Sequence, residues 1–248
     1  EITFPIPTLE VQKRIAQALD AWDTATQKPE QLIEAKERHY THELSRFISR
    51  GQYSHHHISE FARDVSERNR DGICERVLSV TNDRGFVLPE HQFERRVASE
   101  DLSNYKVVRK GQYAYNPSRI NVGSIARLDD YDIGVLSPMY VVFAIDEIKV
   151  NSDFFKHWLD SHEARERIKR SAQGSVRETV SFTEFATIRF PLPLLEQQQK
   201  IANYLNALRE EIVLLAAYAG KLKEQKRGLM QKLLTGQWRL NTAEEMSA

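Results

Sequence analysis

The fold is decided by a stretch that the chain carries twice: Phe4-Pro5-Ile6-Pro7-Thr8-Leu9-Glu10-Val11-Gln12 and, near the other end, Phe190-Pro191-Leu192-Pro193-Leu194-Leu195-Glu196-Gln197-Gln198. Residues 4–21 align on residues 190–207 with ten identities in eighteen positions. Each copy runs into a long amphipathic stretch that ends in Gly-Gln, at residues 51–52 and 236–237. An internal repeat indicates two equivalent structural units, here with a different segment held between them.

The second amphipathic stretch has the spacing of a coiled-coil helix. Apolar residues recur at alternating intervals of four and three from Ile201 to Leu222, and the pattern resumes at Leu229 and Leu233 after a polar interruption at Lys226. This heptad pattern predicts a helix that buries one narrow face. A helix over about residues 198–234 would be ~55 Å long at about 1.5 Å per residue, which suits a spacer better than a small domain.

The first amphipathic stretch carries a weaker stripe of the same kind, and Pro29 falls inside it. A proline in a helix interior removes a hydrogen bond and clashes with the preceding turn, so the sequence predicts a kink or a split there. A single apolar stripe is most simply the core-facing side of a helix, whereas two related stripes favour an antiparallel helix pair. The residues predicted to pair the two helices are Ile15, Leu19, Trp22, Ile201, Leu205, Leu208, Ile212, Leu215, Leu222, Leu229 and Leu233.

The segment between the two helical arms predicts a mixed α/β domain. Residues 154–170 have helical spacing, and runs of β-branched and aromatic residues indicate strands over 76–81, 112–115, 122–127 and 139–145. The predicted fold class is α+β: one mixed α/β domain flanked by two long helices that pair as an antiparallel coiled coil. The predicted organisation is a first repeat and arm over 1–52, the mixed domain over 53–188, a second repeat and arm over 189–240, and a tail over 241–248.

Composition narrows the class of protein. With no run of about 18 apolar residues, no membrane span is predicted. The single cysteine, Cys74, excludes an internal disulfide and fits a reducing cytoplasm. Because the chain starts with Glu1 and the repeated motif begins almost at once, we expect a fragment or a processed piece.

No catalytic constellation stands out. Residues 116–119, Asn-Pro-Ser-Arg, lack the second proline and the aromatic side chain of the Asn-Pro-Pro-Tyr box with which adenine methyltransferases stack a flipped base. Residues 55–57 are three consecutive histidines, but three adjacent side chains of an extended linker cannot all face one metal ion. We therefore predict no catalytic residue, no metal site and no cofactor on this chain.

Two loops contain the residue types that contact nucleic acids. Arginine and asparagine make paired hydrogen bonds to base edges, while serine and backbone amides hold phosphates. A net charge of zero argues against a uniformly basic binder, yet cations gather over residues 106–127 and 165–177. The alternative, that these are ordinary polar loops, remains open for either loop alone. The two loops carry Asn116, Ser118, Arg119 and Asn121, and then Ser175 and Arg177.

The two repeats resemble the conserved helical regions of type I restriction-modification specificity subunits. The resemblance lies in Leu195-Glu196-Gln197-Gln198-Gln199-Lys200-Ile201-Ala202 after the proline-rich lead, and in Lys226-Arg227-Gly228-Leu229-Met230-Gln231-Lys232-Leu233-Leu234-Thr235-Gly236. Residues 111–126, 137–143 and 174–177 resemble a target-recognition domain of the same family. Together these motifs cover nearly the whole chain.

The resemblance implies a noncatalytic, sequence-specific DNA-binding subunit in the cytoplasm, with residues 53–188 as its target-recognition domain. Its implied partners are double-stranded DNA, methyltransferase subunits and a restriction/motor subunit. S-adenosylmethionine is expected on the methyltransferase subunit and not on this chain. Full subunits of the family carry two recognition domains, each reading half of a bipartite site, so this chain resembles the second half or a half-size subunit. A homodimer through the arms would read an inverted repeat.

The resemblance also sorts the candidate residues. Residues that the whole family shares cannot dictate one target, so Tyr113, Tyr115, Asn116, Pro117 and Gly123 are expected to shape the fold or hold phosphates. Less family-like loops supply the candidates for base discrimination: Arg68, Asn69, Arg70, Asn82 and Arg84. The alternative function is a protein-interaction decoy or regulator of such a complex, without DNA recognition of its own. Convergence of Arg119 and Arg177 on one concave face would favour the DNA reader.

Overall fold

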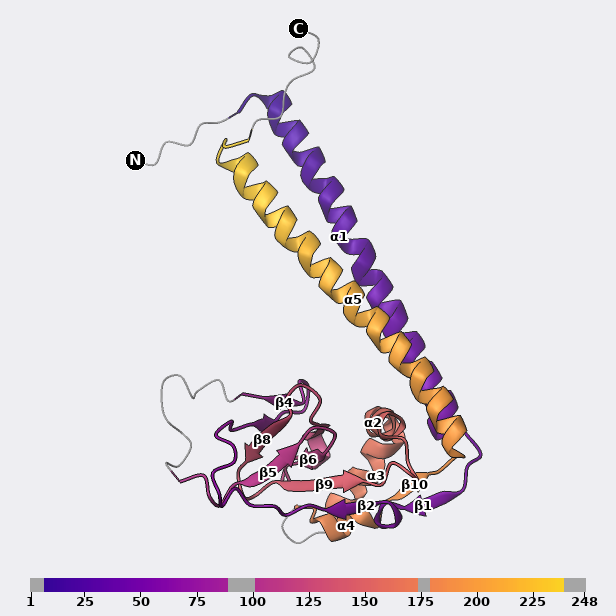
Figure 1. The fold of residues 1–248 in the computed structure, drawn as a ribbon. Coiled ribbons are helices and arrows are strands. Elements are labelled where there is room, and N and C mark those ends of the chain that lie inside the picture. Colours follow the sequence, from indigo (N-terminus) through magenta and orange to yellow (C-terminus); the bar gives the residue numbers. More distant parts are fainter. Residues whose placement is uncertain (1–6, 89–100, 174–178, 239–248) are drawn as a thin grey trace. The chain divides into compact units, whose positions relative to one another are not determined.

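The computed structural model describes residues 7–88, 101–173 and 179–238, and its helices and antiparallel sheets confirm the predicted α+β class (Figure 1). The chain divides into two compact units. The arm unit comprises Glu1–Thr41 and Asn206–Ala248, and the domain unit comprises His42–Leu205. Among the described residues, no helix combines the length and the apolar composition needed to cross a membrane.

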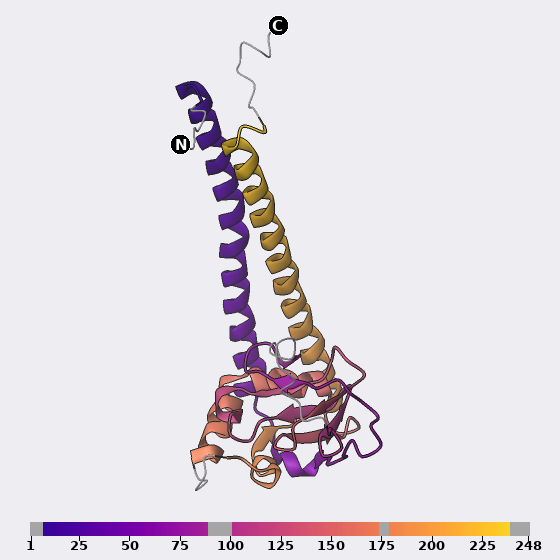
Figure 2. The same ribbon diagram turned by 90° about the vertical axis from the view of Figure 1, so that its left-hand side faces the viewer.

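Two long helices, α1 (Leu9–Leu44) and α5 (Leu195–Leu234), form the arm unit over most of their lengths and run antiparallel, as predicted (Figures 1 and 2). Gly236, with a φ of 71°, lies just beyond the end of α5, where a left-handed residue commonly ends a helix. The contacts that cross between the helices follow opposite sequence directions: Asp23 with Lys226, Glu30 with Lys223, Lys36 with Glu211, and Tyr40 with Arg209.

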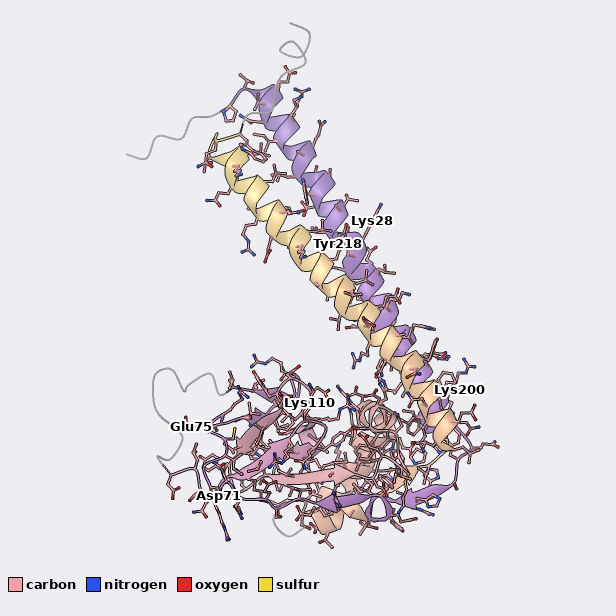
Figure 3. The ribbon with its side chains drawn as sticks, in the orientation of Figure 1. Lys28, Asp71, Glu75, Lys110, Lys200 and Tyr218 are labelled. Carbon is pink, nitrogen blue, oxygen red and sulfur yellow. The ribbon has the colours of Figure 1, made fainter. Side chains whose placement is uncertain are left out.

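The side chains at the predicted pairing positions are withdrawn from solvent. Those that are buried are Ile15, Ile201, Leu205, Ile212 and Leu233, and those that are half-buried are Leu19, Trp22, Leu208, Leu215, Leu222 and Leu229. Off this stripe, Val213, Leu214 and Tyr218 stay more than half exposed. Figure 3 labels Tyr218 on α5 and Lys28 on α1, both of which are exposed. Which of the stripe residues touch across the pair remains a prediction.

Ion pairs add little to this pairing. The pair from Lys36 Nζ to Glu211 Oε1 spans 2.7 Å, and the pair from Lys223 Nζ to Glu30 Oε1 spans 2.5 Å, but all four side chains are 31% exposed or more. Exposed pairs of this kind contribute about 0–1 kcal/mol. Burial of the apolar stripe therefore supplies most of the stabilisation, and the ion pairs favour this register.

Helix α1 continues through Pro29, so the helix is not split at that residue. The proline removes one hydrogen bond from a 36-residue helix, at a cost of about 3 kcal/mol. Its ring is buried, and in the preceding turn the Thr26 hydroxyl donates to the carbonyls of Trp22 and Asp23, both at 3.0 Å. Burial of the ring and the cooperativity of a long helix offset the lost bond.

The central sheet of the domain unit has four antiparallel strands in the described residues, in the order β2 (Ala62–Asp64), β9 (Val141–Ile145), β6 (Tyr113–Tyr115) and β7 (Ile125–Arg127). Tyr113 lies opposite Phe143 on one side and Arg127 on the other. The remaining strands pair in twos: β1 (His55–His57) with β10 (Arg189–Pro191), β3 (Ser79–Val80) with β4 (Phe86–Val87), and β5 (Lys106–Arg109) with β8 (Ile133–Leu136). Each of the four predicted strand regions contains an observed strand.

Two helices replace the single helix predicted over 154–170. Helix α2 (Ser152–Asp160) ends at Ser161, which is extended, with a ψ of 152°. Helix α3 (His162–Gln173) begins directly afterwards, because the Ser161 hydroxyl accepts a hydrogen bond from the Ala164 amide at 3.1 Å. Serine is favoured at such a cap, so the break has a local cause that apolar spacing did not reveal. A short helix, α4 (Phe182–Ala186), follows.

An aromatic core joins the central sheet to the helices. Tyr113 stacks on Phe143 with 5.2 Å between ring centroids, and Phe155 of α2 meets Tyr113 edge-on at the same distance. The core also contains Trp158 and Phe190, and all five side chains are fully buried. Such packing fixes the end of β6 rigidly, because buried aromatic pairs restrict one another's orientation.

Candidate nucleic-acid interface

The β6–β7 loop (residues 116–124) is closed by its own hydrogen bonds. Asn116 Oδ1 accepts from the Ser118 amide at 3.0 Å, and the Asn116 amide donates to the Ser124 carbonyl at 3.1 Å. A single 3-10 turn, η4 (Ile120–Val122), ends at Gly123, whose φ of 94° is a conformation that glycine adopts without strain. The closed loop presents Ser118, Arg119 and Asn121, all exposed.

The turn between β3 and β4 (residues 81–85) is also held locally. The Thr81 amide donates to the Gly85 carbonyl at 2.8 Å, and the Arg84 amide donates to Thr81 Oγ1 at 3.1 Å. The side chains of Asn82, Asp83 and Arg84 are exposed at its tip. The carboxylate of Asp83 lies among the donors, so this turn is not a purely cationic surface.

These two segments lie side by side. The Ser124 hydroxyl, only 2% exposed, donates to the Val80 carbonyl at 2.8 Å. A Cβ on Gly123 would lie 3.6 Å from the Asn82 carbonyl oxygen, so the two backbones approach closely. The structure thereby brings together predicted residues that are 34 or more positions apart: Asn82 and Arg84 with Ser118, Arg119 and Asn121.

The third predicted segment is flanked by described residues that contact the β6–β7 loop. Ser175 and Arg177 lie outside the described residues, so their positions stay predictions. The chain re-enters the described part at residue 179, where the Val180 amide donates to the Pro117 carbonyl of the β6–β7 loop at 3.1 Å. Helix α3, which precedes the segment, packs on η4. The described residues on either side of 174–178 therefore belong to elements that contact the β6–β7 loop.

The loop at residues 68–74 differs from its prediction. Asn69 is 2% exposed, and its amide group makes two hydrogen bonds to the Cys74 backbone, at 2.9 and 3.1 Å. Both polar atoms are thus engaged inside the loop, which corrects the prediction that Asn69 reads bases. Arg68 donates to the Asn104 carbonyl, whereas Arg70 is exposed. Asn116 is 8% exposed and closes its own loop, so it shapes the interface from inside.

Of the five cations between residues 106 and 127, few face solvent freely. Lys106 Nζ donates to the Tyr140 carbonyl at 2.6 Å, and burial lowers the pKa of that lysine. Arg109 pairs with Glu67 at 2.7 Å, and Lys110 lies 3.9 Å from Asp132. Arg119, in contrast, is exposed and forms no ion pair with any described residue. Counting charges along the sequence could not distinguish cations that are bonded within the domain from cations that are free to face DNA.

Sequence reasoning missed the network that anchors the β6–β7 loop at its far end. Arg127 Nε donates to Asp129 at 2.6 Å, one terminal nitrogen lies 2.7 Å from Asp153, and the other donates to Ser152 Oγ at 3.0 Å. Burial acts to lower the pKa of Arg127, but hydrogen bonds to the two carboxylates outweigh it and raise that pKa. The sequence signal for this network was the pair of opposite charges, Arg127 and Asp129, on either side of Leu128. The network ties β7 to α2.

The three histidines form strand β1 rather than a free linker. His55, His56 and His57 pair with β10, so this segment is part of a sheet and the prediction of a linker is wrong. His56 Nδ1 lies 2.8 Å from Glu60 and His57 Nδ1 lies 2.7 Å from the Thr187 carbonyl. In residues 7–88, 101–173 and 179–238, no three His, Cys, Asp or Glu side chains are grouped so that they could hold a metal ion.

A family model and a curated relative both match this chain as a type I restriction specificity protein. Residues 99–223, about half of the chain, match the family described as "Type I restriction modification DNA specificity domain". A curated relative from Methanocaldococcus jannaschii, named "Putative type I restriction enzyme MjaX specificity subunit", is 22% identical over 263 residues, which cover 97% of this chain and 60% of the relative.

Solved structures agree on the fold. The HsdS subunit from Thermoanaerobacter tengcongensis superposes with a TM-score of 0.56 at 15% identity, over 95% of this chain and 60% of that one. The S subunit of a type I restriction-modification system from M. genitalium gives 0.56 at 16% identity, over 95% and 62%. The chain thus spans about three-fifths of the length of the relatives that it matches.

Proposed function

This chain belongs to the type I restriction modification DNA specificity family, and from that premise we propose that its domain unit reads a DNA sequence without catalysing a reaction itself. The observation that carries the proposal is the convergence of the β3–β4 turn and the β6–β7 loop, held together by the buried bond from Ser124 to Val80. Fixed loops that present asparagine and arginine side chains suit direct readout of base edges, because rigid donors and acceptors discriminate between base pairs.

We propose that the chain reads one half of a bipartite target. It has one described domain unit between two arms, and it covers about three-fifths of relatives that are longer. The arms would act as a spacer to a second recognition domain. Helices of 36 and 40 residues extend about 54 and 60 Å, which exceeds one turn of B-DNA at about 34 Å.

The arms are also proposed as the assembly scaffold. Methyltransferase subunits, which would carry S-adenosylmethionine, and a restriction/motor subunit would be directed to the target through them, and two copies of this chain would read an inverted repeat. The alternative is a decoy or regulator that binds the partner subunits but not DNA. The exposed Arg119, in the loop that approaches the β3–β4 turn at Gly123, favours the DNA reader. Its convergence with Arg177 is untested, because Arg177 lies outside the described residues.

Single-molecule methylation mapping tests this function. DNA is exposed to this chain together with its methyltransferase partner, and adenine methylation is mapped base by base. If this chain reads one half-site, methylation should occur at a bipartite motif. That motif should be palindromic if two copies of the chain supply both halves. A stable complex with the partner that methylates no defined motif would support the decoy, and titration with a full-length subunit of the family would show whether a second recognition domain is required.

A further inference from the structure

Helix α3 has a polar face that the domain unit does not bury. Its inward side carries Ala164, Ile168 and Ala172, which are 0%, 3% and 4% exposed. The solvent-facing part of the helix carries Arg165, Lys169 and Arg170, all exposed. Arg165 and Lys169 are neighbours four residues apart, and Arg170 lies further around the helix. We call these three residues the α3 basic face.

The acidic residues of α3 do not neutralise this face. Glu163 is held by Arg167, with 2.8 Å between a terminal nitrogen and Oε1, and it also lies 3.6 Å from His55 Nε2. Its side chain is only 16% exposed. Glu166 is half-buried on the same side as the basic residues, so three cations stand against one carboxylate. In a chain of zero net charge, this excess results from the fold.

The position of α3 connects this face with the candidate interface. The helix packs on η4, within the β6–β7 loop that presents Arg119 and Asn121. Residues 174–178 follow its last turn, and the Val180 amide then returns to the Pro117 carbonyl. Ser118 and Arg119 are exposed in the same loop. The basic face therefore belongs to an element that is fixed directly against the loop.

We propose that the α3 basic face binds the phosphates of one DNA strand beside the bases that the β3–β4 turn and the β6–β7 loop read. The three cations span about 7.5 Å along the helix axis at about 1.5 Å per residue. One strand of DNA carries a phosphate about every 3.4 Å along its axis, so the face can meet two or three phosphates. Such contacts position a protein on the duplex without reading its sequence.

The inference rests on the proposed function, but it can be tested without knowledge of the target. The probe is a scrambled 40-bp duplex, bound by the full chain in complex with its methyltransferase partner, and the dissociation constant is measured between 50 and 200 mM salt. Each phosphate contact contributes about 0.9 to the slope of log affinity against log salt. The triple variant Arg165→Gln/Lys169→Gln/Arg170→Gln should lower that slope by about 2 to 3 and weaken binding to every sequence alike.

Two single variants sharpen the test. Glu166→Gln removes the carboxylate from this side of α3 and should tighten binding to the scrambled duplex. Arg63→Gln is the matched control, since Arg63 is also exposed but lies on strand β2 in a hollow lined by Glu60, Asp146 and Glu147. It should leave the slope unchanged.

An unchanged slope in the triple variant, or an equal loss in Arg63→Gln, would overturn the inference. So would loss of methyltransferase binding with DNA affinity intact, which would assign the face to an acidic protein partner. A wild-type complex that does not bind the scrambled duplex at 50 mM salt would also overturn it. The proposed function fails separately, if methylation mapping finds no defined motif.

Discussion

The hydrogen bond from Ser124 to Val80 is the structural link between the two segments of the candidate interface, and its removal is the sharpest test of that geometry. Ser124→Ala deletes a buried donor and leaves the Val80 carbonyl without it. Leaving such a buried acceptor unpaired costs about 1–3 kcal/mol, and we expect about 1–2 kcal/mol because alanine fits the same space. For a unit of this size that corresponds to a fall in melting temperature of about 2–8 °C.

The matched control is Ser118→Ala, a second serine of the same loop that is exposed and whose amide, rather than its hydroxyl, bonds to Asn116. Its unfolding free energy should change by less than about 0.5 kcal/mol. Urea denaturation, followed by the fluorescence of Trp158 in a Trp22→Phe/Trp238→Phe background, reports the domain unit, because Trp158 is fully buried there. Equal denaturation midpoints for the two serine variants would refute the claim that this bond couples the turn to the loop.

Three further perturbations follow from the same structure. Arg127→Met leaves Asp129 and Asp153 without their shared partner, and urea denaturation should show a loss of about 2 kcal/mol. This is less than the ~3–5 kcal/mol lost when a fully buried pair is broken, because both carboxylates are about a third exposed and Lys156 still pairs with Asp129. Arg109→Met, in an exposed pair with Glu67, should cost less than about 1 kcal/mol, and equal losses would contradict the anchoring role. Burial acts to raise the pKa of Asp129, but hydrogen bonds from Arg127 and Lys156 outweigh it and lower that pKa, so the stability that this carboxylate provides is present above its unfolded pKa of about 3.9 and is lost as pH falls through the lower folded value. Wild type and Asp129→Asn should therefore differ in unfolding free energy near neutral pH, and the difference should shrink as pH falls below about 4 and through the lower folded pKa of Asp129. A difference that stays constant into acid would count against this ionisation. Residues 208–214 and 35–41 lie opposite each other in the arms, because Lys36 meets Glu211 and Tyr40 meets Arg209. Deleting both segments shortens the arm by about 10 Å. Methylation mapping should then find the half-sites about 3 bp closer, and an unchanged spacing would contradict the spacer role.

The arms could be predicted in detail because the spacing of apolar residues along the sequence determines their fold. The stripe from Ile201 to Leu233 alternates at intervals of four and three, and a helix pair needs no other information to decide which face is buried. The continuity of α1 at Pro29 could not be predicted in the same way. It depends on burial of the proline ring and on the cooperativity of a 36-residue helix, neither of which is visible in a short sequence window.

The candidate interface could be predicted as residue types but not as a site. Asn82 and Arg119 are 37 positions apart, and only the folded structure shows that their loops are neighbours, through the bond from Ser124 to Val80 and the close approach of Gly123 to Asn82. Asn69 and Lys106 have side chains that suit DNA, yet both are withdrawn from solvent, Asn69 to close its own loop and Lys106 to bond to the Tyr140 carbonyl. Whether a polar side chain faces outward depends on long-range packing, and no local pattern reports it.

The most direct test of the central claim is to map the methylated motif for the wild-type chain and for Asn121→Ala, each in complex with the same methyltransferase partner. Asn121 is exposed in the β6–β7 loop beside the β3–β4 turn, and a base-reading side chain changed to alanine costs about 1–3 kcal/mol at one base position. The account predicts that the variant methylates a motif relaxed at one position, while Arg63→Gln keeps the wild-type motif. An unchanged motif in Asn121→Ala and in Arg119→Ala, with the complex intact, would contradict the claim that this loop reads the target.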